Sequence, residues 1–276
     1  MISLFIGISN LAIGLAYAGL GVIGAWETIS LHRYRGWSRF GIGFVLMAAS
    51  CGPHHLVHGW HVLQGETVSW QMLAVTVIGL PAGLIFVGLR LERMVGGQGE
   101  RVVAASADRA AMLATAMTLV TGLLAAGVLA QPAADLFQVL CTSAGLVAKP
   151  IDAAVDFMSV TFVANLFVTI AYGMVGWYLA DCQVRRYLAN GFWSLSGVAL
   201  AGVFFTCAQM HLIDATTHDD GLLLIFDLIG IPASIYFLWV VKLVHNDSVM
   251  DWNRRPLVGA AAAPTRPSPW SESPQR

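Results

Sequence analysis

Two Cys–His pairs at helical spacing are the residues of this sequence best suited to chemistry. Cys51 precedes His55 by four residues, and Cys207 precedes His211 by the same interval. Residues four apart lie on one face of a helix, so each thiol would stand beside an imidazole. A soft thiolate next to a neutral imidazole suits Cu(I) and, less selectively, Zn(II). The sequence therefore predicts a metal site with Cys51, His55, Cys207 and His211 as ligands.

Other polar residues near the two pairs could add ligands or guide metal to them. A stripe of three histidines, at 54, 58 and 61, runs towards the end of the first Cys–His segment. This stripe is either a capture site that passes metal inward or a polar helix end that meets water. The additional metal or access candidates are His54, His58, His61, Met210, Asp214 and His218.

A third group of polar side chains lies inside apolar segments. Asp227 has no basic partner in its own segment, and a carboxylate in such a segment is a functional hypothesis by default. The alternative role for this group is hydrogen bonding between helices. The group, which is expected to orient the ligands or to line a ligand pocket, consists of Asn10, Tyr17, Asn165, Tyr172 and Asp227.

Long apolar segments must position these residues. The chain has 276 residues, of which 57% are hydrophobic and 11% charged, and this composition is typical of a polytopic membrane protein. We expect seven transmembrane helices, because a backbone in lipid must satisfy its own hydrogen bonds. Each is about 20 residues long, and they lie at roughly 3–26, 40–63, 68–90, 111–130, 155–180, 192–214 and 222–244.

Basic residues predict the orientation of these helices. Arg and Lys follow the first, third, fifth and seventh segments, whereas the opposite side holds only Lys149. Because basic loops stay in the cytoplasm, we expect the N-terminus outside and the C-terminus inside, in a bacterial inner or other plasma membrane. Residues 247–276, rich in Pro, Ala and Ser, are expected to be a disordered cytoplasmic tail.

The sequence repeats itself at an offset of 151 to 156 residues. Four anchors recur in the same order: Asn-Leu-x5-Tyr at 10 and 165, Trp-Ser-x2-Gly at 37 and 193, Cys-x3-His-Leu at 51 and 207, and Ile-Gly-x-Pro-Ala at 78 and 229. This pattern predicts an all-α membrane protein with two parallel three-helix units, at 1–95 and 155–246. Residues 96–154 would supply a cytoplasmic loop, a linker helix and an outside loop. Parallel units imply a pseudo-two-fold axis along the membrane normal, with the Cys–His pairs beside it.

Each unit resembles the membrane sensor domain of plant and cyanobacterial ethylene receptors. In that family a Cys-Gly-x-x-His-Leu motif on the second helix binds copper(I), the cofactor that holds ethylene. Residues 51–56 fit the motif in full, and residues 207–212 fit it with Ala208 in place of glycine. The family's Ile-Ser-Asp-x5-Ala-Tyr run is similar to residues 8–17, where Asn10 replaces the acid. The resemblance covers about residues 8–92 and 160–243.

The resemblance implies a Cu(I)-binding sensor of copper or of a small π-ligand such as ethylene. The family works as a dimer of three-helix units, which the tandem copy could supply within one chain. The family signals through attached GAF and kinase-like domains, whereas here we expect the signal to pass to a separate partner protein. We expect neither an enzyme nor a nucleic-acid-binding protein, because no hydrolase, kinase or nucleotide motif occurs.

Three other functions stay open from the residues alone. The first is a copper transporter or insertion factor that meets a separate copper-handling protein and uses the outer histidines for access. The second is a redox protein with haem between His55 and His211. The third is a scaffold without a ligand, in which the Cys–His pairs only pack. The cysteines are expected to be free thiols in every case.

Overall fold

The structure, a computed structural model, describes residues 2–66, 68–104, 157–217, 221–246 and 257–258. Within these residues six helices are long and apolar enough to cross a membrane, which agrees with the predicted helical membrane architecture. They are α1 (Ile2–Arg35), α2 (Arg39–Leu63), α3 (Trp70–Met94), α6 (Val160–Asn190), α7 (Leu195–Thr217) and α8 (Gly221–Asn246). The expected linker helix at 111–130 lies outside the described residues, as do the loop up to residue 154 and most of the tail 247–276.

Two helices run further than their apolar segments. α1 continues to Arg35 and α6 to Asn190, whereas the hydropathy pattern places their ends at 26 and 180. Backbone hydrogen bonds of a helix do not need lipid, so a helix continues until a residue stops it. Gly36 and Gly191 have φ angles of 71° and 73°, a left-handed conformation that suits glycine and ends a helix.

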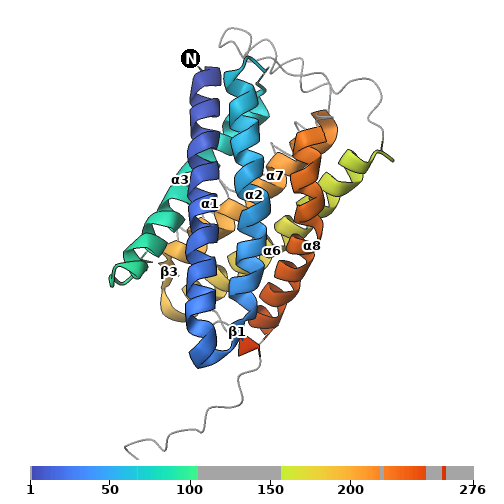
Figure 1. The fold of residues 1–276 in the computed structure, drawn as a ribbon. Helices are drawn as coiled ribbons and strands as arrows, with labels where there is room; N and C mark the ends of the chain where they lie inside the picture. Colours follow the sequence, from blue (N-terminus) through green and yellow to red (C-terminus); the bar gives the residue numbers. More distant parts are fainter. Residues whose placement is uncertain (1, 67, 105–156, 218–220, 247–256, 259–276) are drawn as a thin grey trace, which may run out of the picture.

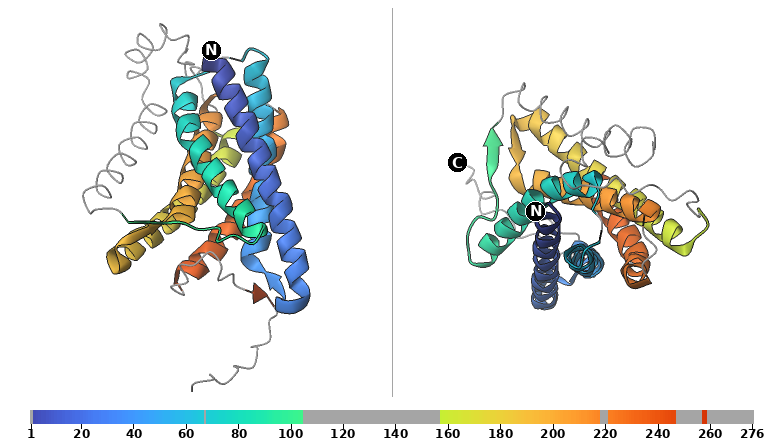
Figure 2. Two further views of the ribbon diagram at one scale, coloured as in Figure 1. Left: turned by 90° about the vertical axis from the view of Figure 1, so that its left-hand side faces the viewer. Right: turned by 90° about the horizontal axis from the view of Figure 1, so that it is seen from above.

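The helices form two groups of three that pack against each other. α1 packs along α2 and also contacts α3, while α6 packs along α7 and also contacts α8. The groups are joined where α2 meets α8 and where α3 meets α7 (Figure 1). Seen from above, α2 lies between α1 and α8 (Figure 2). Each group therefore contributes one face to a central interface.

The central interface holds the largest cluster of buried apolar residues. Phe44, Phe86, Phe204 and Phe237 are buried in it, and the rings of Phe204 and Phe237 stack with centroids 5.4 Å apart. Lipid tails are as apolar as these side chains, so close packing rather than transfer from water holds such a bundle together. The cysteines of the two Cys–His pairs belong to this cluster.

Matching serines begin the second helix of each group. Ser38 Oγ accepts a hydrogen bond from Gly41 N at 3.0 Å, and Ser194 Oγ accepts one from Gly197 N at 3.1 Å. Both serines end short strands, β1 (Trp37–Ser38) and β3 (Phe192–Ser194). β1 pairs with β4 (Leu257–Val258), and β3 pairs with β2 (Val102–Ala104), both antiparallel. The recurring Trp-Ser-x2-Gly pattern is therefore a helix N-cap.

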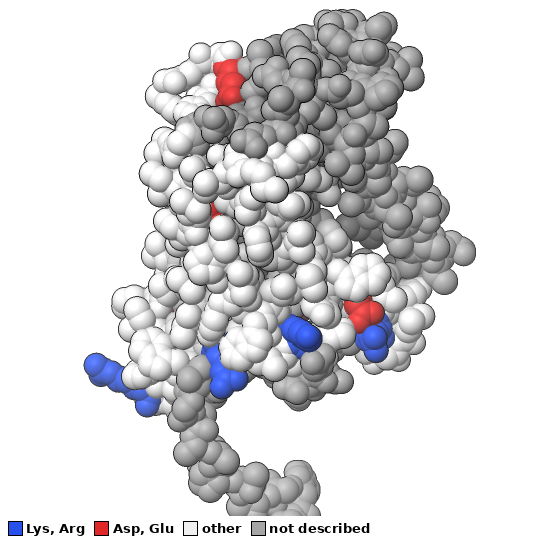
Figure 3. Space-filling view, turned by 90° about the vertical axis from the view of Figure 1, so that its right-hand side faces the viewer, with Lys and Arg blue, Asp and Glu red and all other residues white. Residues whose placement is uncertain are grey.

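The basic residues of the described chain gather at one end of the bundle. They lie near the ends of α1, α3, α6 and α8 and at the start of α2, and Arg101 lies just before β2. Figure 3 shows the Lys and Arg side chains of one face together at its lower end. The two groups therefore present their charged ends on the same side.

Candidate metal centre

Cys51 and Cys207 meet in the middle of the bundle. Cys51 is the central residue of the 25-residue helix α2, and its Sγ lies 3.2 Å from the Sγ of Cys207 on α7. Both thiols are buried and free. The Nε2 of His55 lies 3.9 Å from Cys207 Sγ. We call Cys51, Cys207 and His55 the sulfur cluster; their ligand atoms lie within 4.8 Å of one another.

Asn10 on α1 orients the imidazole of His55. The Asn10 amide donates to Ile6 O at 2.9 Å and lies 3.4 Å from Thr76 Oγ1, which leaves its Oδ1 as the acceptor. His55 Nδ1 therefore donates to Asn10 Oδ1 at 2.9 Å. The proton of the neutral ring is held on Nδ1, and Nε2 presents its lone pair to the thiols.

Glycines on α2 allow α1 to come this close. A Cβ on Gly52 would lie 3.0 Å from the backbone nitrogen of Ala18, and one on Gly59 would lie 2.9 Å from the backbone nitrogen of Leu11 and 3.1 Å from Asn10 Cβ. Small residues at helix contacts are a common packing device in membrane proteins. The glycine of the Cys-Gly-x-x-His motif therefore has a steric role, since it brings the asparagine of α1 to the histidine.

His211 repeats the arrangement of His55 but has a different neighbour. Its Nδ1 lies 2.7 Å from Asn165 Oδ1 on α6, as His55 Nδ1 lies beside Asn10. It also lies 3.2 Å from Asp227 Oδ1 on α8. The structure thus groups His211 with His54 and Asp227, whose ligand atoms lie within 4.8 Å of one another, and not with the thiols. We call these three residues the histidine–aspartate cluster.

His54 lies between two buried carboxylates. Its Nε2 is 2.8 Å from Asp214 Oδ2, and its Nδ1 is 3.3 Å from Asp227 Oδ1. Its ring centroid lies 4.6 Å from that of His211 and 6.2 Å from that of His55. Consecutive residues of α2 therefore serve the two clusters: His55 joins the sulfur cluster and His54 joins the histidine–aspartate cluster.

The other predicted site residues fall into three groups. Tyr17 and Tyr172 are buried and meet the rings of His55 and His211 edge-on, with centroids 5.5 Å and 5.7 Å apart. Met210 packs with apolar side chains such as Ile6 and Val62. The remaining three are histidines: His58 is buried, His61 is half-buried and His218 lies outside the described residues.

Thr76 was not singled out from the sequence, although it contacts Asn10 as Asp227 contacts Asn165. Its signal was the repeat itself, because the 151-residue offset of the Ile-Gly-x-Pro-Ala anchor pairs position 76 with position 227. A comparison of the two units position by position would have found it. The pairing identifies an alcohol and a carboxylate in equivalent places.

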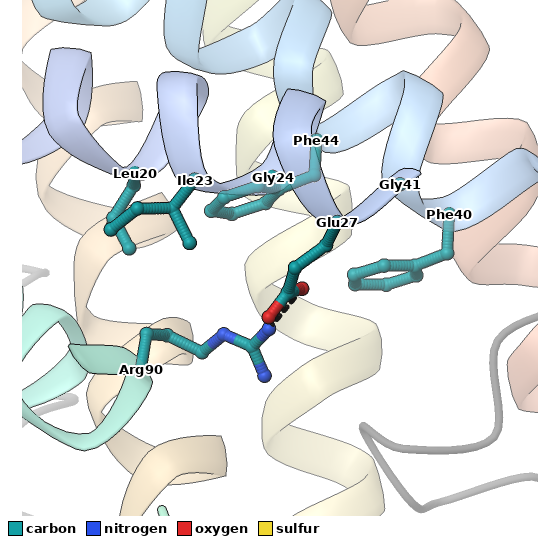
Figure 4. Close-up of a pocket in the computed structure, with 8 residues that line it drawn as sticks. All are labelled: Leu20, Ile23, Gly24, Glu27, Phe40, Gly41, Phe44 and Arg90. Carbon is teal, nitrogen blue, oxygen red and sulfur yellow. Dashed lines mark hydrogen bonds and ion pairs between the residues drawn. The ribbon is translucent and has the colours of Figure 1, made fainter. Parts of the chain in front are cut away.

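An ion pair near the basic end of the bundle was also missed. Arg90 Nη2 on α3 lies 2.6 Å from Glu27 Oε2 on α1, beside a small cavity lined by Phe40 and Phe44 (Figure 4). The cavity measures about 10 Å³, which is room for about one water molecule. A pair that neutralises itself in this way offers no ligand to a metal, so its role is to hold α3 against α1.

Comparisons of the chain with protein-family models, with curated proteins and with solved structures give no match.

Proposed function

We propose that this chain is an integral membrane protein that binds Cu(I) between its two groups of helices, through Cys51, Cys207 and His55. One observation carries the proposal: two free thiols and an imidazole nitrogen converge at mid-helix, buried from solvent. Thiolate and imidazole are the ligands that Cu(I) prefers. The neighbouring Asn10 supports the role of His55, because metal-bound histidines usually donate their other ring proton to an oxygen.

The spacing of the ligand atoms fits one metal ion after a small adjustment. With a metal–sulfur distance of about 2.3 Å, two sulfurs of a tetrahedral site lie about 3.8 Å apart, and a sulfur and a nitrogen about 3.6 Å apart. The measured distances are 3.2 Å for the sulfurs and 3.9 Å for Cys207 Sγ and His55 Nε2. The sulfurs would separate by about 0.6 Å, which a rotation of either side chain supplies.

The proposed architecture is the two parallel three-helix units, joined by the linker helix expected at 111–130. The helix contacts support it, because exchanging α1, α2 and α3 with α6, α7 and α8 leaves the set of packed pairs unchanged. Gly79 faces Thr206 and Gly230 faces Ser50 in the same reciprocal way. The gathered basic residues favour an outside N-terminus and a cytoplasmic C-terminus.

We assign the copper a sensing role of the kind found in ethylene receptors, with the signal passed to a separate protein at the basic end. A small apolar cavity lies beside Tyr17 and would have to widen to admit a molecule larger than water. It measures about 10 Å³ and is lined by Tyr17, Phe86 and Leu200, among others. Tyr17 in turn meets the ring of His55. A molecule in this cavity would therefore lie next to the metal site.

A second candidate is copper handling, which the histidines of α2 favour. His61 is half-buried at the end of α2, and His58 and His54 follow inward and are buried. Such a line could pass metal from the surface towards the thiols. Replacing His58 and His61 by alanine would lower copper accumulation by cells if the protein moves copper, and would leave it unchanged if the protein only senses it.

Metal analysis of detergent-purified protein tests the copper site. We expect one Cu(I) per chain after reconstitution under reducing conditions, and none in the Cys51→Ala or Cys207→Ala variants. Cys182→Ala is the matched control, because Cys182 lies in α6 away from the cluster and should leave copper unchanged.

Failure to bind copper in wild-type protein with free thiols would overturn the proposal. The absorption spectrum of the same sample distinguishes the remaining functions. A Soret band would identify haem, whereas a spectrum without metal or haem absorption would leave the scaffold. Ethylene binding is measured next, only on protein that carries copper.

A further inference from the structure

The histidine–aspartate cluster is not used by the copper site. Its residues come from α2, α7 and α8, and all three are buried with at most 1% of their surface exposed. Buried polar groups are ordinarily paired, and each exception calls for an explanation. Here His54 Nδ1 makes no hydrogen bond among the described residues; it faces Asp227 Oδ1 at 3.3 Å, and that oxygen also lies 3.2 Å from His211 Nδ1.

The hydrogen bonds of each imidazole indicate which ring nitrogen carries the proton and which presents a lone pair to its neighbours. His54 Nε2 donates to Asp214 Oδ2 at 2.8 Å, and in a neutral ring this leaves a lone pair on Nδ1. That lone pair and the Asp227 carboxylate then face each other, and two electron-rich atoms in a dry interior repel unless a cation lies between them. His211 Nδ1 lies between two acceptors, 2.7 Å from Asn165 Oδ1 and 3.2 Å from Asp227 Oδ1, so it carries the ring proton and leaves Nε2 as a base.

The bonded partners follow the pattern of metal-binding histidines. Such histidines donate one ring proton to a carboxylate or a carbonyl and present the other nitrogen to the metal. Asp214 serves His54 in this way, and the Asn165 amide serves His211. Asn165 is itself fixed, because its Nδ2 donates to Thr161 O at 3.1 Å and to Asp227 Oδ2 at 2.8 Å.

The spacing between His54 and Asp227 suits a first-row divalent ion. With metal–ligand distances of about 2.0–2.1 Å, the ligand atoms of a tetrahedral site lie about 3.3 Å apart. His54 Nδ1 and Asp227 Oδ1 are 3.3 Å apart. Two imidazoles and a carboxylate are harder ligands than two thiolates and an imidazole, so the two clusters differ in the metal they prefer.

We propose that His54, His211 and Asp227 form a second metal site, for a divalent first-row cation of the Zn(II) type, supported by Asp214. This site lies beside the proposed copper site but does not depend on it, because it contains neither thiol. The protein would then hold two metals of different softness side by side within one helix bundle.

Titration of purified full-length protein with Co(II), as a spectroscopic stand-in for Zn(II), tests the second site. The thiol site is first filled with Cu(I) under reducing conditions. We expect one Co(II) per chain, displaced by Zn(II), with visible d–d bands and no sulfur-to-cobalt charge-transfer band. The Cys51→Ser, Cys207→Ser double variant should keep this cobalt while it loses copper.

Variants of the cluster should give the opposite result. His54→Gln and Asp227→Asn are expected to lose the Co(II) bands while they keep Cu(I), which also shows that they fold. Asp214→Asn should weaken Co(II) binding by about 10- to 100-fold, as loss of a hydrogen-bond partner of a ligand does. The matched control is Met210→Leu, at the position that the repeat pairs with His54, and it should bind Co(II) as wild type.

Three results would overturn the second site. The first is no Co(II) or Zn(II) bound by copper-loaded protein, which would mean that a doubly protonated His54 bridges the two aspartates instead. The second is a sulfur charge-transfer band, which would place cobalt at the thiols. The third is undiminished Co(II) binding in Asp227→Asn. Failure of copper to bind in the same preparations would instead count against the proposed function alone.

Discussion

The helices α1–α3 and the helices α6–α8 carry the same asparagine–histidine pair but differ in the residues next to it. In each group an asparagine of the first helix binds the Nδ1 of a histidine on the second. The distance is 2.9 Å for Asn10 and His55 and 2.7 Å for Asn165 and His211. These matched residues converge on the junction of the groups, where a single soft metal site would use ligands from both.

Among the described residues, those that differ between the two groups form a polar cluster only around His54 and Asp227, and not around their counterparts Met210 and Thr76. The 156-residue offset pairs His54 with Met210, and the 151-residue offset pairs Thr76 with Asp227. Met210 packs in an apolar cluster, whereas His54 lies between two carboxylates. Two similar groups can therefore share one site and still build a second, polar site from the positions where they differ.

Replacing His54 by methionine, the residue at the matching position 210, should have the largest effect. The change leaves Asp214 and Asp227 buried without the imidazole between them. Removing one partner from a buried charged network costs about 3–5 kcal/mol. We expect the free energy of unfolding in detergent to fall by that amount, as measured by denaturant titration of the helical circular dichroism.

A double-mutant cycle sharpens this prediction. His54→Met combined with Asp227→Thr, the residue of the other group at that position, should cost clearly less than the sum of the two single changes, because the variant no longer buries that carboxylate. Additivity within about 0.5 kcal/mol would show that the two side chains do not interact. Met210→Leu is the control and should cost less than about 1.5 kcal/mol.

The ion pair of Glu27 and Arg90 is the second difference between the groups. The corresponding positions hold Cys182 and Val241, since the offsets there are 155 and 151. Arg90→Val removes the Arg90 partner of a partly buried carboxylate and should lower the free energy of unfolding by about 2–3 kcal/mol, between the values for surface and buried pairs. The double variant Glu27→Cys, Arg90→Val should cost less than about 1 kcal/mol in the same assay. A double variant as unstable as Arg90→Val would refute this account of the pair.

The sequence predicted the helices and the convergence of Cys51 with Cys207, because hydropathy and helical spacing act locally and repeat in both groups. It could not predict where α1 and α6 end. Their ends depend on Gly36 and Gly191, whose conformation is not marked in a hydropathy pattern. The linker helix, the tail and the role of His218 stay predictions, since they fall outside the described residues.

The repeat suggested that the two Cys–His pairs occupy equivalent places, and this symmetry does not hold for the histidines. Four equivalent ligands were expected, yet the structure places His211 beside Asp227 and His54. The cause is a tertiary contact: Asp227 replaces the threonine of the other group and attracts the ring proton of His211 at 3.2 Å. Such a preference arises only when side chains of α7 and α8 meet in the folded bundle, and spacing along one helix cannot show it. Copper binding by any of these residues stays a prediction.

Gly52→Ala tests whether the closer packing of α1 on α2 matters, since Ala208 stands at the matching position. The new Cβ would meet the backbone of Ala18 at 3.0 Å and the carbonyl oxygen of Gly14 at 3.3 Å, and backbone atoms cannot turn aside. We expect a loss of about 1–2 kcal/mol in the denaturant assay, together with weaker Cu(I) binding as Asn10 moves from His55. Ala208→Gly should cost less than about 1 kcal/mol, and an equal loss in both variants would argue against a special contact.

The smallest effect is expected at Glu100, which anchors the start of α7 and has no counterpart at the start of α2 among the described residues. Its Oε2 accepts from Ser194 Oγ at 2.7 Å and from Ser196 Oγ, and its Oε1 accepts from Ser196 N at 3.1 Å. Burial alone would raise the pKa of Glu100, but the hydrogen bonds from Ser194 and Ser196 outweigh it and hold the pKa below its usual value.

The lowered pKa fixes the sign of the pH effect. Above the unfolded pKa of about 4.3 the charged Glu100 stabilises the fold in full, and this contribution is lost as the pH falls through the folded value. Because the side chain is partly exposed, Glu100→Gln should cost at most about 1 kcal/mol at neutral pH. The variant should also lose less stability than wild type on acidification below about pH 4.5. Parallel pH profiles of unfolding for the two proteins would show that Glu100 does not link the loop after α3 to α7.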